Sequence, residues 1–367
     1  MRNSGLYVHV PFCLTKCVYC DFYSITQTDL IDEWLLAVEQ EAALYGAGEA
    51  LFNSLYIGGG TPSLLGEERL ARLFEALHRH FTFSTDAEIT AEANPDDATR
   101  SSLSFMKSLG VNRLSLGIQS FDDRELAFLK RRHDSAQARG SIGAAMDAGF
   151  SNIGLDLIYG LPDQTNKAWK ATLEQAVSFR PAHVSCYLLT VEGEAPLAAM
   201  AREGKVSLPG EERLRSLFLL TSKLLESRGF IHYEVSNFAA SEALTCRHND
   251  KYWTHAPYLG LGPAAHSFDG RTRWWNVRSV AAYCEALKKG KSPVEDSETL
   301  TPEQLALERC YLGARTKRGI SLADLPPGAA PALRQLSKAR LVRRLGDRLI
   351  PTTRGFLVAD SLPVLLT

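Results

Sequence analysis

The segment VHVPFCLTKCVYCDF, residues 8–22, holds three of the seven cysteines of this chain. Cys13, Cys17 and Cys20 have the spacing C-x3-C-x2-C and directly follow a short β-branched and aromatic run, Leu6–Val10. A strand that leads into a tight loop can point three thiolates at one centre. Because four-cysteine sets close every iron of an iron–sulfur cube, three thiolates leave one iron open to a substrate. The segment therefore predicts an open iron–sulfur cluster rather than one that only carries electrons.

Two other interpretations compete with the open cluster. In the first, the cysteines are buried thiols. In the second, they form a zinc site with a histidine as the fourth ligand. Zinc sites usually pair cysteines as two C-x2-C units, and the sequence has no second pair. The other cysteines are scattered and are interpreted as ordinary half-buried thiols: Cys186, Cys246, Cys284 and Cys310.

Length and charge narrow the class of protein. A chain of 367 residues suggests a large domain with a smaller one. With 41 Lys and Arg against 42 Asp and Glu, it is not a general polyanion binder, and we expect no nucleic-acid partner. It has no basic segment followed by an apolar core at its start and no apolar run near eighteen residues, so we expect neither a cleaved signal nor a membrane span. Clustered cysteines in such a chain indicate metal chemistry in a reducing compartment, hence a cytoplasmic location.

Strands alternate with single helices over the first half of the chain, which predicts βαβ crossovers and a parallel sheet in an α/β fold. The number of predicted strands is six, fewer than the eight of a closed barrel. Their expected ranges are 6–10, 54–57, 88–92, 113–118, 153–158 and 183–189.

Polar residues follow the ends of these strands, where parallel α/β folds place their sites. The cysteines, the GGGTP segment at 58–62, Glu92, Gln119 and Asp156 all lie there. The glycines let a ligand approach the main chain and suit an ammonium group that meets backbone carbonyls. A ribose diol or an ammonium would pair with the two carboxylates, which are costly to bury alone.

Arg131 adds a fork that can hold a carboxylate. Singly, each of these residues is more often a structural hydrogen-bonding group than a ligand contact. Together they predict a pocket for an amino acid joined to a nucleoside.

The region from Cys246 to Asn276 has no periodicity and is interpreted as a long functional loop. It contains His248, Tyr252 and Trp253, and further on Tyr258, Trp274 and Trp275. Ordinary aromatic packing explains any one of them. As a cluster they predict a wall for a large flat ligand, with an imidazole able to ligate iron. The alternative ligands are His133, His232 and His266. The GLGPAA segment at 260–265 is rejected as a nucleotide site, because it follows no clear strand and contains a proline.

From Thr301 the pattern is helical again. A helix at 332–340, a hairpin that turns at Gly346-Asp347 and a closing helix at 356–366 are similar to a winged-helix unit. We expect it to serve as a packing domain, because it lacks a clear basic recognition helix. The expected division is 1–246 for the parallel α/β domain, 247–300 for a linker region with the aromatic and histidine site, and 301–367 for the winged-helix-like domain.

With C-x3-C-x2-C followed by GGGTP, the sequence resembles the radical S-adenosyl-L-methionine (SAM) superfamily. Pro11-Phe12, Tyr19 and the segments EANP, GIQSFD and LDLIYGLP extend the resemblance to its coproporphyrinogen-oxidase-like branch, across essentially the whole chain. The resemblance implies a partial (β/α)6 barrel with a 4Fe-4S cluster on the three cysteines, and SAM bound to the open iron. By position in the family's motifs, the SAM contacts are Tyr7, Tyr19, Gly59, Gly60, Thr61, Glu92, Gln119, Arg131 and Asp156.

Two groups within that branch compete. Oxygen-independent coproporphyrinogen III oxidases, which perform an oxidative decarboxylation, have a fourth cysteine where this chain has Phe22. HemW-type heme chaperones lack it and carry an H-N-x-x-Y-W motif, matched by His248, Asn249, Tyr252 and Trp253. The chain looks like the second group, which implies heme as cargo on His248, Tyr252 and Trp253, delivery to a respiratory haemoprotein at the cytoplasmic face of the membrane, and no oxidase activity. Enzymatic SAM cleavage, a transient membrane contact and a homodimer are left open.

Overall fold

The computed structural model describes residues 2–46, 50–191 and 195–366, which fall into two compact units. The first unit comprises residues 1–157, 190–206 and 256–299, and the second comprises residues 158–189, 207–255 and 300–367. Each unit is therefore assembled from segments that are far apart in the chain.

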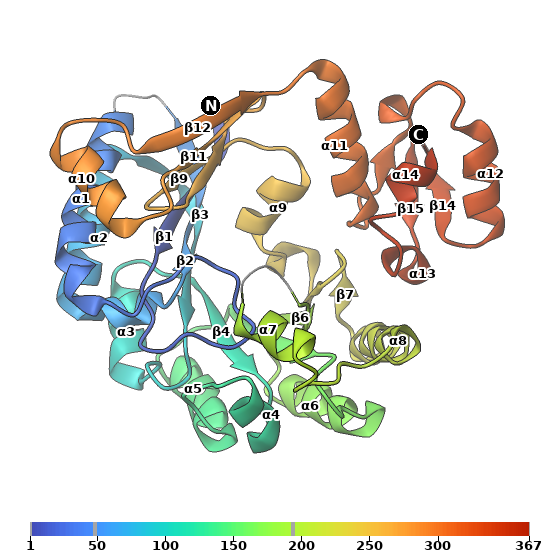
Figure 1. Ribbon diagram of the computed structural model, residues 1–367, viewed down its shortest axis with the longest axis horizontal. Coiled ribbons are helices and arrows are strands. Elements are labelled where there is room, and N and C mark those ends of the chain that lie inside the picture. The colour runs from blue at the N-terminus through green and yellow to red at the C-terminus, as the bar shows by residue number, and fades with distance from the viewer. Residues whose placement is uncertain (1, 47–49, 192–194, 367) are drawn as a thin grey trace. The chain divides into compact units, whose positions relative to one another are not determined.

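The first unit is built on a sheet with the strand order β12-β11-β10-β9-β1-β2-β3-β4-β5 (Figure 1). From β9 to β5 in that order the strands are parallel, and β10, β11 and β12 extend the sheet antiparallel. Helices connect the successive parallel strands, which is the βαβ arrangement that the sequence predicts. The strands are β1 Arg2–Val10, β2 Leu51–Gly59, β3 Thr82–Ala93, β4 Arg113–Gln119, β5 Ile153–Tyr159, β9 Tyr258–Leu261, β10 His266–Phe268, β11 Thr272–Asn276 and β12 Val294–Thr299.

The helices of this unit begin at clear sequence signals. α3 and α5 start with capping boxes, in which Thr99 exchanges hydrogen bonds with Ser102, and Asp134 with Gln137. α1 buries an apolar stripe that includes Trp34 and packs beside α2 and α10 (Figure 1). The helical elements are η1 Thr28–Leu30, α1 Ile31–Tyr45, η2 Pro62–Leu65, α2 Gly66–His80, α3 Arg100–Ser108, α4 Asp123–Phe128, α5 Ser135–Asp147, α7 Pro196–Arg202 and α10 Val280–Lys288.

The two faces of the sheet differ, and this difference positions the candidate site. Along β1, Leu6 and Val8 are fully buried at one face, whereas Tyr7 points to the other, because successive side chains of a strand alternate. In the strand pairing, Tyr7 lies opposite Tyr56 of β2 and Gly260 of β9. These residues therefore belong to the same face of the sheet as Tyr7. We call the face that carries Tyr7 the polar face.

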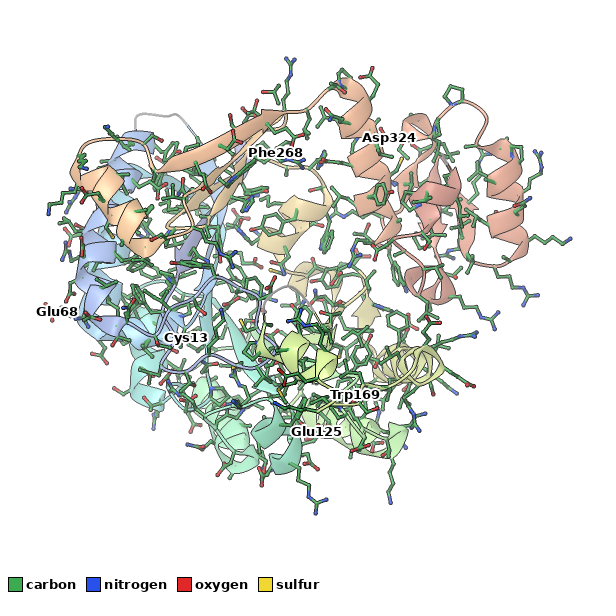
Figure 2. The ribbon with its side chains drawn as sticks, viewed as in Figure 1. Cys13, Glu68, Glu125, Trp169, Phe268 and Asp324 are labelled. Atoms are coloured by element: carbon green, nitrogen blue, oxygen red, sulfur yellow. The ribbon has the colours of Figure 1, made fainter. Side chains whose placement is uncertain are left out.

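The second unit contains several helices and the strands β6, β8 and β7, which pair antiparallel in that order. The indole nitrogen of Trp169, labelled in Figure 2, is buried and donates to the hydroxyl of Thr221 at 2.7 Å, which ties α6 to α8. The elements are α6 Asn166–Ser178, β6 His183–Leu188, α8 Glu211–Ser227, β7 Ile231–His232, β8 Asn237–Ala239, η3 Glu242–Leu244, α9 Arg247–Trp253 and α11 Pro302–Ala314.

The C-terminal segment of the second unit has an antiparallel sheet, β13-β15-β14, and its own apolar core. The hairpin turns at Gly346-Asp347, as predicted. The predicted continuous helix at 356–366 is wrong, because α13 ends at Phe356, turns follow, and α14 begins only at Leu362. Pro363 lacks a backbone N–H and occupies the second position of α14, which suits the start of a helix rather than its interior. The elements are β13 Ile320–Ser321, η4 Leu322–Asp324, α12 Ala330–Lys338, β14 Val342–Leu345, β15 Arg348–Pro351, α13 Thr353–Phe356 and α14 Leu362–Leu366.

The region from Cys246 to Asn276 is not the long loop that the sequence predicted. It forms α9, β9 and the antiparallel pair β10–β11, and β9 pairs in parallel with β1. The GLGPAA segment starts inside β9, so the expectation that it follows no strand was also wrong. The prediction failed because β9 is short, contains Gly260 and obtains its order from a strand remote in sequence.

The predicted α/β class, with a parallel central sheet and a C-terminal antiparallel domain, is confirmed. A division by function at residues 246 and 300 stays a prediction. Over the described part of the chain, no helix is both long and apolar enough to cross a membrane.

Candidate functional site

The cysteine segment forms a loop that leaves the carboxyl end of β1 and is closed at its base. The amide of Cys13 donates to the carbonyl of Ile25 at 3.0 Å, and the amide of Ile25 donates to the carbonyl of Pro11 at 2.7 Å. Cys13, labelled in Figure 2, is partly exposed, as are Cys17 and Cys20. The four scattered cysteines are buried, which goes further than the half-buried state expected for them.

Two of the three cysteine sulfurs accept hydrogen bonds from residues outside the cysteine loop. The hydroxyl of Thr61 donates to Cys13 Sγ at 3.5 Å, and Arg131 Nη1 donates to Cys17 Sγ at 3.5 Å. Hydrogen bonds to the sulfurs are one of the features by which a protein tunes the reduction potential of an iron–sulfur cluster. Over the described residues, no three His, Cys, Asp or Glu side chains form a site for a single metal ion. This finding is compatible with a cube, because each cysteine then binds a different iron.

The glycine segment has a steric reason for each of its three residues. A Cβ on Gly60 would lie 2.6 Å from the carbonyl oxygen of Phe12 in the cysteine loop. A Cβ on Gly59 would lie 2.5 Å from the His9 ring, and its φ of +111° already excludes most side chains. A Cβ on Gly58 would lie 2.9 Å from the carboxylate of Glu92. The segment therefore packs tightly against both the cysteine loop and the polar face.

Two carboxylates meet on the polar face. Glu92 of β3 accepts hydrogen bonds from the Tyr56 hydroxyl at 2.7 Å and from the Gly59 amide at 3.1 Å. Burial raises the pKa of Glu92 to about 7, and the charge of Asp156 adds to the rise, while these two hydrogen bonds oppose it. Asp156 of β5 accepts from the Ser115 hydroxyl at 2.8 Å. A cationic or diol ligand would stabilise the ionised form of Glu92, whose pKa lies near 7 and which is repelled by the charge of Asp156.

Arg131 links the cysteine loop to the third and fourth strands. Besides Cys17, its guanidinium donates to the Gly117 carbonyl at 2.9 Å and to the side-chain oxygen of Asn94. Asn94 in turn donates to Thr61 Oγ1 at 3.1 Å. Thr61, Asn94 and Arg131 thus form one hydrogen-bonded bridge between Cys13 and Cys17.

Gln119 and Tyr19 also lie at this edge of the sheet. The backbone of Gln119 has a φ of +63°, an uncommon conformation outside glycine, and its side-chain nitrogen lies 3.0 Å from where a Cβ on Gly117 would stand. Tyr19 interacts with Arg131, and burial raises its pKa well above the usual value.

Tyr7 is held by a histidine that the sequence-based prediction missed. The Tyr7 hydroxyl and His9 Nδ1 are 2.9 Å apart, and His9 Nε2 lies 2.8 Å from the carbonyl oxygen of Tyr23. Since a carbonyl can only accept, Nε2 carries the proton, and the Tyr7 hydroxyl donates to Nδ1. Burial lowers the pKa of His9 to about 4, so the ring stays neutral and this arrangement is fixed.

The nine predicted SAM contacts all lie in the first unit, around the carboxyl ends of its parallel strands. The residues present fit an amino acid joined to a nucleoside: two carboxylates, a glycine cradle and a partly buried guanidinium. Prediction missed the residues that hold the contacts in place: His9, Tyr56, Asn94 and Ser115. Strand alternation was the available signal, because it puts His9 beside Tyr7 and Tyr56 across from it.

The predicted heme residues lie in the second unit, on α9. His248 and Tyr252 are one helical turn apart and meet, with 3.0 Å between His248 Nε2 and the Tyr252 hydroxyl. The His248 side chain is only 1% exposed, and burial, followed by the charge of Lys251, lowers its pKa to about 3. Trp253 is partly exposed, with the guanidinium of Arg315 5.7 Å from its ring centre.

The other aromatic residues of the predicted wall, Tyr258, Trp274 and Trp275, belong to the first unit. The alternative ligands differ in their surroundings. His232 is buried with both ring nitrogens bonded, to Ser222 and to the Val235 carbonyl. His133 is buried with Nε2 on the Ile118 carbonyl, whereas His266 is exposed.

Comparison with known proteins gives the family. The family model of the radical SAM superfamily matches residues 7–176. The heme chaperone HemW of Mycobacterium tuberculosis is 40% identical over 367 residues, which cover 97% of this chain and 93% of that protein. HemW of Bacillus subtilis is 36% identical over 319 residues, covering 86% and 84%.

Coproporphyrinogen III oxidase (HemN) from Escherichia coli, a radical SAM enzyme, has a solved structure that matches with a TM-score of 0.86 over 100% of this chain and 90% of that one. At 23% identity, this likeness shows the fold alone. The relatives of 36–40% identity over most of their length decide the family. The chain belongs to the HemW family of heme chaperones within the radical SAM superfamily.

Proposed function

We propose that this chain is a cytoplasmic heme chaperone that binds heme together with a SAM-ligated 4Fe-4S cluster and delivers the heme to respiratory haemoproteins. The observation that carries the proposal is its 40% identity to a heme chaperone along 97% of its length. Supporting it are the three partly exposed cysteines on one loop and the exposed Phe22 where an oxidase would have a fourth cysteine.

Within this proposal, Cys13, Cys17 and Cys20 hold the cluster. SAM occupies the polar face between Glu92 and Asp156, with Arg131 at the cysteine loop. The family motif assigns heme to His248, Tyr252 and Trp253, but the proposed function does not depend on which histidine ligates iron. The cluster supplies an open iron that can bind the amino and carboxylate groups of SAM.

The second candidate is an oxygen-independent coproporphyrinogen III oxidase, favoured by the fold match to HemN along the whole chain. The two functions differ in one measurable respect. An oxidase converts coproporphyrinogen in the presence of SAM and a reductant, whereas a chaperone binds heme in a stoichiometric complex and leaves coproporphyrinogen unchanged.

The test uses the full chain after anaerobic reconstitution of the cluster. We expect an absorbance titration to show one heme per chain at micromolar concentrations. We also expect transfer of that heme to an apo-haemoprotein and no product from coproporphyrinogen. Turnover of coproporphyrinogen, or no heme binding at micromolar concentration, would refute the chaperone function.

A further inference from the structure

A heme ligand that loads and releases its cargo needs an imidazole that the iron can reach. Of the nine histidines in the chain, all of which are described, only His78 and His266 have exposed side chains. His248, the histidine of the family motif, is 1% exposed, and its Nε2 faces the Tyr252 hydroxyl. Iron could bind His248 only if α9 rearranged and that hydroxyl moved.

His266 is placed differently. It starts β10 and lies opposite Trp275 of β11 in the antiparallel register. The two rings stack, with centres 5.8 Å apart and an interplanar angle of 28°. Within the described part of the chain, no hydrogen bond to the His266 ring occurs, so both its nitrogens stay available. Partial burial, followed by the charge of Arg273, lowers the pKa of His266, which keeps the ring neutral at pH 7.

Register places His266 on the polar face, with the predicted SAM contacts. Gly5 of β1 lies opposite Tyr258, and Tyr258 lies opposite Phe268 of β10. Since Tyr7 follows Gly5 by two residues and His266 precedes Phe268 by two, all of them point to the same side. The first unit therefore holds the exposed imidazole and the SAM residues on one continuous face.

This part of the polar face has the composition of a porphyrin site. Tyr258 and Trp275 are partly exposed, and the Tyr258 ring packs on the buried Phe268 with ring centres 6.3 Å apart. Large flat apolar ligands bind such surfaces well. Gly260, between Tyr7 and these aromatic residues, has no room for a side chain, because a Cβ there would lie 2.3 Å from the His266 carbonyl oxygen. Gly260 is buried, so the backbone of residues 265–266 covers the sheet at this position, and the open part of the face lies around Tyr258, His266 and Trp275.

Arg273 supplies a cation that could pair with the heme propionates. Arg273 lies opposite Phe268 in the register, and its guanidinium is 2.6 Å from Glu298. Both side chains of this ion pair are well exposed, at 38% and 43%. Exposed pairs contribute little, so exchange of the Glu298 carboxylate for a propionate costs little.

We propose that His266 is the axial ligand of the heme iron, with the porphyrin against the partly exposed rings of Tyr258 and Trp275. This inference rests on the proposed heme-chaperone function and names the ligand that the function requires. It places heme on the sheet face assigned to SAM, and it gives α9 and its His248 a structural role.

His78 is the natural control, because it too is exposed and stacks on an aromatic ring, that of Phe74 at 6.2 Å. It lies in the last turn of α2, directly before β3 starts, and so at the amino end of the parallel strands. Sites in parallel α/β folds form at the opposite end.

The experiment titrates hemin into the full reconstituted chain and into the variants H266A, H78A and H248A, and follows the Soret band. We expect H266A to shift the Soret maximum and to weaken binding by at least about tenfold, the loss of one good ligand bond. Added imidazole should restore the wild-type spectrum of H266A. H78A should bind within about twofold of wild type. Circular dichroism, iron content and the response to SAM should match wild type in H266A.

The outcomes are separable. If H266A keeps the wild-type Soret spectrum and heme affinity, His266 is not the ligand. If heme affinity falls in H248A alone, the iron binds α9, which also overturns the assignment to His266. If H248A unfolds, the conservative H248Q is used in its place. Failure of the wild-type chain to bind hemin refutes the proposed function itself, a result distinct from either of the others.

Discussion

Removal of one hydroxyl should shift the pH at which this protein binds SAM. Tyr56 donates to Glu92 at 2.7 Å and thereby holds down a pKa that burial has raised to about 7. A hydrogen bond to a charged group contributes roughly 1.5–3 kcal/mol, equivalent to about one to two pKa units. In Tyr56→Phe the pKa of Glu92 should therefore rise to about 8–9.

The consequence at neutral pH is large. The ionised fraction of Glu92 at pH 7 falls from about half to about 1–10%, so SAM affinity should fall roughly 5–50-fold if the ligand needs the carboxylate. At pH 9.5 the variant should recover to within about twofold of wild type, because most of its Glu92 is ionised again. The loss of affinity is confined to the lower pH values because a raised Glu92 pKa means that the carboxylate forms only at higher pH.

The assay is a SAM titration of the reduced, reconstituted protein from pH 6.5 to pH 9.5, followed by the electron paramagnetic resonance of the cluster. Tyr45→Phe is the matched control, since the Tyr45 hydroxyl accepts from Trp274 at 3.3 Å and does not contact Glu92. An equal loss of affinity at every pH would refute the reasoning, because the hydroxyl would then act on the ligand and not through the Glu92 pKa. So would an unchanged affinity at pH 7.

Three further results are expected. Cys17→Ala should lose most iron and sulfide, measured by chemical assay, whereas Cys186→Ala should keep them, because Cys186 is buried and lies outside the C-x3-C-x2-C motif. Asp156→Ala should keep its iron, weaken the spectral response to SAM and move the pH midpoint of binding downward, because the charge of Asp156 raises the pKa of Glu92. Glu41, fully buried with a pKa raised to about 7, holds its proton when folded but loses it near pH 4.5 when unfolded. Urea unfolding of the wild-type chain should therefore show stability falling between those pH values, and in Glu41→Gln that fall should be smaller by up to about 3 kcal/mol.

The parallel strands and the cysteine loop were predictable because their signals are local. Short apolar runs mark β1, β2, β4 and β5, and alternation of polar and apolar residues marks β3. Polar or glycine residues lie near the carboxyl ends of these strands. Alternation along β1 would also have paired Tyr7 with His9. By contrast, the bridge from Thr61 through Asn94 to Arg131 joins three loops, and nothing in the local pattern states which donor meets which acceptor.

The β9–β12 extension was not predictable for a physical reason. Its first strand, Tyr258–Leu261, is too short for a periodic pattern, and it is ordered by β1 at the other end of the chain. Aromatic and glycine residues there suggested a loop, whereas they pack against strand and helix neighbours. The burial of His248 was equally invisible, because a histidine between polar residues of a short helix gives no indication of which side it faces.

The place of β1 within its sheet has a consequence for synthesis of the chain. β2 follows β1 closely, but β9, which covers its other side, begins at Tyr258. At the usual 5–20 residues per second, a ribosome needs roughly 10–50 s to add the roughly 250 residues between them. During that interval the nascent chain presents β1 as an unpaired strand edge, which can pair with other chains. Chaperone binding to the nascent chain would therefore matter most before residue 258 emerges.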